Sequence, residues 1–111
     1  MTEPYYDLSD DWSLIVSSFQ TQYGIRLATE LPNMGWREFS YMLEGLSGDT
    51  PLGRIVSIRA ENAPDRLKQF TPEQRKIRTE YRKKVAKRKP KAEVERAYEG
   101  FKTALIKMAQ Q

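Results

Sequence analysis

The stretch DWSLIVSSFQTQYG, residues 11–24, decides how the chain begins to fold. Its apolar residues recur at positions i, i+3, i+4, i+7 and i+11, which share one face of an α-helix. These residues are Trp12, Ile15, Val16, Phe19 and Tyr23. A carboxylate of Asp10 or Asp11 can cap the first turn, and Gly24 tolerates the left-handed backbone that ends many helices. The stretch predicts a helix over about residues 11–23.

Two more helices are predicted immediately downstream. One covers about residues 34–46, with Asn33 as its capping residue. The next begins at Thr50 and runs to about residue 61, because a capping hydroxyl followed by Pro51 favours a helix start. Residues 25–31 are short and alternating, which predicts an extended connector with at most a minor strand. The expected core members are Trp12, Ile15, Val16, Phe19, Trp36, Phe39, Leu43, Leu46, Leu52, Ile55 and Val56.

Two amphipathic helices are predicted in the C-terminal third. Thr71, Pro72 and Gln74 combine an N-cap, a first-turn proline and a capping box, which predicts a helix over about 72–89. Beyond Pro90 a second periodic segment covers about residues 92–109. The candidate partner-binding residues lie on the apolar faces of these two helices: Tyr81, Val94, Tyr98, Phe101, Leu105 and Met108.

The predicted fold class is therefore all-α. The chain divides into a flexible N-terminus over residues 1–10, a helical core domain over about 11–70 and basic C-terminal helices over 71–111. The last five candidate residues form a seam with coiled-coil-like spacing. This seam either docks on another protein, such as a second copy of the chain, or folds back onto the first helices of the same chain.

The net charge of +4 hides a strong asymmetry. Residues 1–50 contain two basic and eight acidic residues, whereas residues 51–111 contain 17 basic and seven acidic ones. Such a distribution indicates a surface for nucleic acid or an acidic partner, although a merely solvated helix face or compensation by the acidic half explains it equally well. The candidate polyanion-binding residues are Arg75, Lys76, Arg78, Arg82, Lys83, Lys84, Lys87, Arg88 and Lys89.

The composition excludes several classes of chemistry. The chain has no cysteine and no histidine, so it lacks thiol nucleophiles, thiolate metal sites and the usual general base near neutral pH. We therefore expect no enzymatic activity, no catalytic residues, no metal site and no cofactor. No apolar run approaches the roughly 20 residues of a membrane span, and the acidic N-terminus is unlike a signal peptide. The cytoplasm is the expected location.

Five motifs in a fixed order resemble a known family. They are Phe19–Leu27 (FQTQYGIRL), Met34–Phe39 (MGWREF), Leu43–Leu46 (LEGL), Thr50–Glu61 (TPLGRIVSIRAE) and Phe70–Gln74 (FTPEQ). The chain resembles, over about residues 11–82, small proteins encoded by tailed phages and prophages of Gram-positive bacteria. Their genes lie between those for the major tail protein and the tape-measure protein, which is the position of tail-assembly chaperones.

The resemblance implies a non-enzymatic assembly factor that acts in the host cytoplasm. Its implied partners are the tape-measure protein, the major tail protein or both, bound through amphipathic helices in helix-in-groove contacts. The same gene position also suits a minor structural tail component. The rival from another class is a nucleic-acid-binding protein that uses the basic helix over 75–91. No helix-turn-helix signature accompanies that run, so any duplex binding is expected to be weak, non-specific and sensitive to salt.

Overall fold

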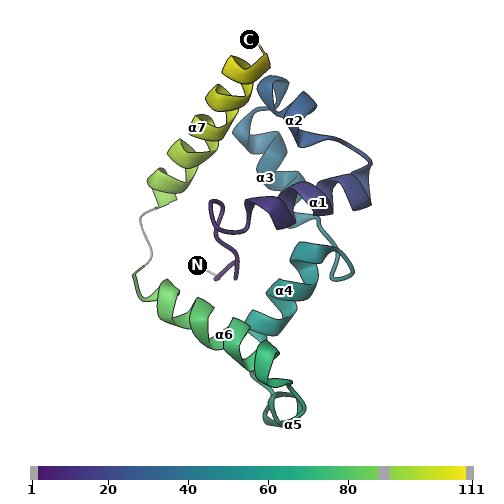
Figure 1. Cartoon of the computed structure of the whole chain (residues 1–111), viewed down its shortest axis with the longest axis vertical. Coiled ribbons are helices and arrows are strands. Elements are labelled where there is room, and N and C mark those ends of the chain that lie inside the picture. The colour runs from purple at the N-terminus through teal and green to yellow at the C-terminus, as the bar shows by residue number, and fades with distance from the viewer. Residues whose placement is uncertain (1–2, 88–90, 110–111) are drawn as a thin grey trace.

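The computed structural model describes residues 3–87 and 91–109, and all regular structure in these ranges is helical (Figure 1). The all-α prediction is confirmed. The elements are α1 (Trp12–Tyr23), α2 (Leu27–Glu30), the 3₁₀ turn η1 (Leu31–Asn33), α3 (Trp36–Glu44), α4 (Pro51–Ala60), α5 (Pro64–Lys68), α6 (Pro72–Val85) and α7 (Lys91–Ala109). None of the helices in the described ranges is long and apolar enough to cross a membrane.

The helix boundaries follow the capping signals of the sequence. Gly24 ends α1 with φ +70°, a conformation that side chains disfavour. At α4 the Thr50 hydroxyl accepts a hydrogen bond from the Gly53 N–H at 3.0 Å. Thr71 and Gln74 form the expected capping box at α6, with reciprocal bonds of 3.1 and 2.9 Å. These short-range features were predictable because each one involves residues within a single helical turn.

Tertiary contacts replace local caps at two places. Ser18 of α1 accepts a hydrogen bond from the Leu52 N–H at 2.9 Å, so it satisfies a free donor at the start of α4. Asp11 precedes α1 but makes no side-chain cap. Its carboxylate instead accepts the Asp7 N–H at 2.8 Å and pairs with Arg59.

The connector after α1 is helical, so the prediction of an extended segment over 25–31 is wrong. Leu27 and Leu31 are one turn apart and both are fully buried, which gives this segment a helical apolar face that covers the core. Asn33 lies within η1, and Gly35 takes the N-cap position of α3 in its place.

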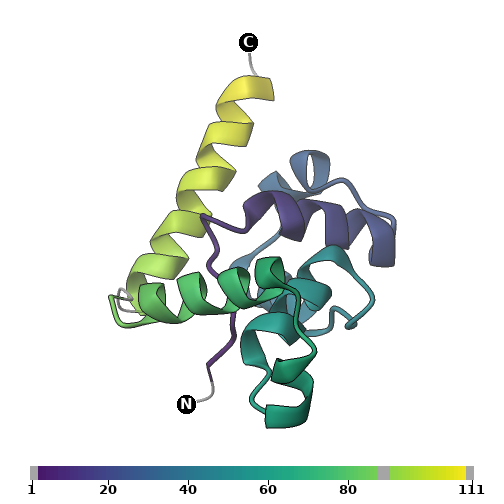
Figure 2. The same ribbon diagram turned by 60° about the horizontal axis from the view of Figure 1, so that its bottom comes forward.

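The helices form an elongated molecule of 50 × 30 × 25 Å. Helices α2, α3 and α7 lie at one end of the molecule, whereas α4, α5 and α6 occupy the other end (Figures 1 and 2). Helix α1 packs against α4 and so joins the two ends. Helix α6 packs on α4 and α7 packs on η1, so the last two helices pair with different neighbours rather than with each other.

One buried apolar cluster runs through the molecule. Its members are Leu8, Ile15, Phe19, Leu27, Leu31, Met34, Phe39, Leu43, Leu52 and Tyr98. Of the predicted core residues, five belong to this cluster, and Trp12, Val16, Trp36, Leu46 and Val56 are partly buried against it. Ile55 lies outside the cluster, because α4 turns the face of Leu52 and Val56 toward the core and Ile55 is rotated away from them.

The expected division into three segments differs from the packing. Tyr98 in α7 belongs to the same core as Phe39 in α3, so a boundary near residue 70 does not separate independent packing units. The N-terminal segment is also held in place from residue 3 onward. Leu8 is buried, and Glu3 accepts a hydrogen bond from the Tyr81 hydroxyl at 2.6 Å.

Candidate protein-interaction surface

The apolar seam of α7 faces the core of its own chain. Tyr98 is fully buried, and its ring centroid lies 4.6 Å from that of Phe39 and 5.2 Å from that of Trp36. The Tyr98 hydroxyl donates a 2.9 Å hydrogen bond to the Met34 carbonyl. One turn further along α7, Phe101 stacks on Trp12 at 4.7 Å. Side chains of α1, α3 and η1 thus form an apolar groove that holds an amphipathic helix.

This packing corrects the expectation that the whole seam is free to dock on another protein. Tyr98, Phe101 and Leu105 are covered by the chain's own helices, as the fold-back alternative requires. Met108 is the seam residue left open, with 69% of its surface exposed. Val94 lies outside the residues whose side chains the structure describes. Helical spacing predicted the seam correctly as apolar, but the spacing alone does not identify the surface it meets.

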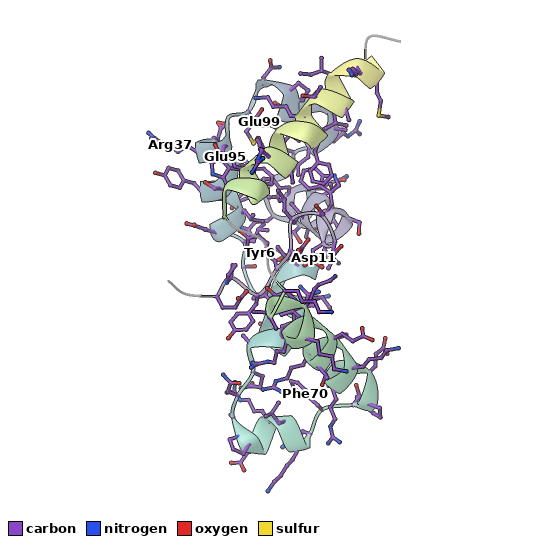
Figure 3. All side chains as sticks on the ribbon, turned by 90° about the vertical axis from the view of Figure 1, so that its left-hand side faces the viewer. Tyr6, Asp11, Arg37, Phe70, Glu95 and Glu99 are labelled. Atoms are coloured by element: carbon purple, nitrogen blue, oxygen red, sulfur yellow. The ribbon has the colours of Figure 1, made fainter. Side chains whose placement is uncertain are left out.

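The outer side of α7 carries charges of both signs, with Glu95, Arg96, Glu99 and Lys107 all exposed. Glu95 and Glu99 lie on the side of the molecule that also carries Arg37 of α3 (Figure 3). Burial, together with the nearby carboxylates of Glu99 and Glu38, raises the pKa of Tyr98 to about 12. The phenol therefore stays neutral in the folded chain well above the pH at which a free tyrosine ionises.

Alkaline pH should destabilise the fold through this one group. The unfolded chain releases the Tyr98 proton near pH 10, whereas the folded chain holds it up to about pH 12, so stability is lost as the pH rises through this interval. We expect Tyr98 to account for about 1.4 kcal/mol of lost unfolding free energy by about pH 11. The Tyr98→Phe variant lacks the ionisable group. Its unfolding free energy, measured by denaturant titration, should therefore fall less between about pH 9 and pH 11 than that of the parent chain. Equal declines in the two proteins would contradict this prediction.

Most of the basic run on α6 is engaged within the chain. Arg78 donates from Nε to the Glu61 carbonyl at 2.8 Å, and Arg82 donates to the Arg59 carbonyl at 2.9 Å. These bonds satisfy free carbonyl oxygens at the C-terminal end of α4, where cations are favourable. Lys84 forms an ion pair with Asp10 that raises the pKa of the lysine. The arginines that looked available for phosphates therefore stabilise the fold.

The other candidate cations differ in their surroundings. Lys76 lies 4.0 Å from Glu80 on the same helix, and Arg75 donates to the Lys68 carbonyl at 3.2 Å. The side chains of Lys83 and Lys87 are exposed and make no hydrogen bond or ion pair with the residues that the structure describes. The expectations for Arg88 and Lys89 fall outside the described residues.

Tyr81 is a core residue rather than a docking residue. It is 4% exposed, and the Arg59 guanidinium lies over its ring at 4.5 Å from the centroid. Arg59 also forms a bidentate pair with Asp11, at 2.7 and 3.0 Å, and donates to the Tyr5 carbonyl at 3.1 Å. Asp11 lies 48 positions before Arg59 in the sequence. No local signal in the sequence identifies such a distant partner.

Two further accessible features lie on the described surface. A groove of about 390 Å³ lies between α5 and α6 and is lined by Leu67, Lys68, Phe70, Arg75, Arg78 and Thr79. Tyr41 on α3 is 65% exposed, which is unusual for a large aromatic side chain. Among the described residues, no three acidic side chains come together in a way that could hold a metal ion.

Comparison with known proteins identifies the family. No curated protein and no solved structure matches the chain. A family model described as Bacteriophage Gp15 protein matches residues 1–88, which extend from the N-terminal segment through α6. The match includes the aromatic residues of α1 and α3 that form the floor of the α7 groove, whereas α7 lies beyond it. The chain belongs to the bacteriophage Gp15 protein family.

Proposed function

We propose that the chain is a non-enzymatic assembly factor for the tail of a tailed phage. Its proposed partners are the tape-measure protein, the major tail protein or both, and its proposed place of action is the cytoplasm of a Gram-positive host. Membership of a bacteriophage family supports the phage context. The order of the motifs between residues 11 and 82 supports the tail module, since it resembles proteins encoded beside the tape-measure gene.

The observation that carries the proposal is the groove that holds α7. Trp12, Trp36 and Phe39 bind the apolar face of an amphipathic helix, and Met34 accepts a hydrogen bond from it. Tape-measure proteins are long and helical and expose apolar stripes until tail protein surrounds them. We propose that such a stripe takes the place of α7 in the groove, in a helix-in-groove mode. The assembly factor would then shield the stripe until the tail tube forms.

If a partner helix takes the place of α7, a variant that holds α7 less firmly should bind the partner more tightly. A partner that competes with α7 binds only the molecules in which the groove is open. Its apparent affinity is therefore its affinity for the open groove multiplied by the open fraction. Tyr98→Phe removes one hydrogen bond that holds α7, and such a bond contributes about 0.5–1.5 kcal/mol. We therefore expect Tyr98→Phe to bind the tape-measure protein up to about tenfold more tightly than the parent chain.

The experiment is co-expression with each tail protein of the same phage, followed by affinity measurement on the purified chains. Tyr23→Phe is the matched control, because its hydroxyl donates a 2.6 Å bond to the Met42 carbonyl and does not touch α7. Tighter binding of the tail protein by Tyr98→Phe, but not by Tyr23→Phe, supports exchange of α7 for the partner in the groove. Binding that is unchanged by Tyr98→Phe would contradict the exchange, and the absence of binding to both tail proteins would overturn the proposed function.

Two further measurements separate the rival functions. A complex with duplex DNA that selects sequence and survives about 200 mM salt would favour the nucleic-acid-binding protein, because contacts to phosphate alone weaken steeply with salt. Retention of the chain in purified tails would favour a minor structural component over an assembly factor that leaves.

A further inference from the structure

Two patches in distant parts of the molecule complement each other in charge, and each contributes an aromatic side chain. We propose that they bind one another between copies, so that the chain self-associates head to tail. The α3 face around Tyr41 of one copy would enter the groove beside Phe70 of the next. This inference does not depend on the proposed tail partners.

The groove has an apolar floor and a basic rim. Leu67 and Phe70 are half-buried and form the floor between α5 and α6, and Phe70 lies at the end of the molecule away from α3 (Figure 3). Lys68, Arg75 and Arg78 supply positive charge at the rim, and no acidic side chain lines the groove. Such a site fits an aromatic or aliphatic anchor that is flanked by carboxylates.

The rim cations are positioned in advance. Arg75 donates to the Lys68 carbonyl at 3.2 Å, and Arg78 donates to the Glu61 carbonyl at 2.8 Å. Carbonyl oxygens orient the guanidinium groups but do not neutralise them. The charges therefore remain available to a partner, and less side-chain freedom is lost when that partner binds.

The α3 face offers the complementary anchor. Tyr41 is 65% exposed, and tyrosine is among the residues that most often dominate protein interfaces. Glu38 and Glu44 are three positions before and after it and Arg37 is four before it, so the face around Tyr41 carries two acidic side chains and one basic one. Both glutamates are exposed and neither takes part in an ion pair among the described residues.

The occupant of the groove is a second copy rather than the same chain. Helix α3 and the α5–α6 groove lie toward opposite ends of the 50 Å long axis, so one molecule cannot join its own two patches (Figures 1 and 3). Contact between two different patches leaves one of each unused at the ends. Such a heterologous interface adds further copies until a ring closes or the assembly continues as a filament.

The test is the oligomeric state of the full chain, measured by sedimentation at about 50 mM and about 500 mM salt. We expect species larger than a dimer at high protein concentration and low salt, and monomers at high salt. Tyr41→Ala should weaken the association about tenfold or more, because it removes the anchor and leaves the core intact. A parent chain that stays monomeric at low salt, or a Tyr41→Ala chain that associates normally, would overturn the inference.

Two charge-reversed variants provide the decisive experiment. A face variant carries Glu38→Lys and Glu44→Lys, and a groove variant carries Lys68→Glu and Arg75→Glu. Each should be monomeric when alone. An equal mixture should associate again, because the intact groove of the face variant binds the intact face of the groove variant, and the two reversed patches also carry opposite charges.

The controls exclude effects of folding and of net charge. Lys83→Glu with Lys87→Glu changes the net charge by the same amount as the groove variant, but at exposed positions outside the groove, and should associate like the parent chain. Thermal melts of all variants establish that they are folded. Failure of the folded variants to pair, or equal loss of association in this control, would overturn head-to-tail binding.

Discussion

Phe39→Ala should lose about 3–5 kcal/mol of unfolding free energy, which is a large part of the stability of a domain this size. Phe39 is fully buried, and its ring contacts aromatic rings from three helices. These partners are Phe19 at 5.3 Å, Tyr98 at 4.6 Å, and Trp12 and Trp36 at about 6 Å between centroids. Removal of the ring leaves a cavity at the point where α1, α3 and α7 meet, and the surrounding rings cannot all close on it.

The measurement is chemical or thermal unfolding of the two chains. A loss of 3 kcal/mol corresponds to a fall in melting temperature of about 12 °C or more. Tyr41→Ala is the matched control, because it truncates an exposed aromatic residue on the same helix, two positions further along, and should change stability by no more than about 0.5 kcal/mol. If Phe39→Ala melts within a degree or two of the parent chain, the aromatic cluster does not hold these helices together.

Asp11→Ala should cost about 3–5 kcal/mol, although it removes a single carboxylate. Asp11 is 4% exposed and forms the bidentate pair with Arg59. Without the carboxylate, the guanidinium keeps its charge in a site largely shielded from water, where Arg59 Nε already lacks a hydrogen-bond partner in the described structure. The Asp7 N–H also loses its acceptor, so the variant combines an unpaired charge with an unpaired donor.

The neighbouring residue provides the control. Asp10 pairs with Lys84 where both side chains are about half exposed, so Asp10→Ala should cost at most about 1 kcal/mol. The double substitution Asp11→Ala with Arg59→Met should recover much of the loss, because it removes the unpaired charge and keeps an apolar stem under Tyr81. Similar losses for Asp10→Ala and Asp11→Ala in denaturant titrations would show that burial does not determine the strength of these pairs.

These two sites bear on the proposed function in different ways. Phe39 is part of the groove that holds α7, so its truncation should release α7 as well as weaken the core. The pair of Asp11 and Arg59 joins the start of α1 to the end of α4 and lies away from the groove contacts of Tyr98 and Phe101. Loss of the pair should therefore lower stability without selectively opening the groove.

The sequence alone predicted the all-α fold and most of the helix boundaries. The starts of α4 and α6 and the end of α1 depend on capping groups within one turn, at Thr50, Thr71 and Gly24. The core positions of Ile15, Phe19 and Phe39 follow from helical periodicity. The lack of thiol and imidazole groups likewise follows from the composition, which contains no cysteine and no histidine. All of these properties are local or compositional, so they can be predicted from a single sequence.

Only the tertiary structure decided what the predicted faces and charges contact. The α7 seam faces inward because Tyr98 reaches a carbonyl group 64 positions earlier. Two arginines of α6, Arg78 and Arg82, satisfy carbonyl groups at the end of α4 that lie 17 and 23 positions away. Periodicity establishes that a face is apolar or basic, but the same face suits a partner or the chain's own core equally well. The choice depends on which distant surfaces the folded chain brings together, and short-range patterns do not contain that information.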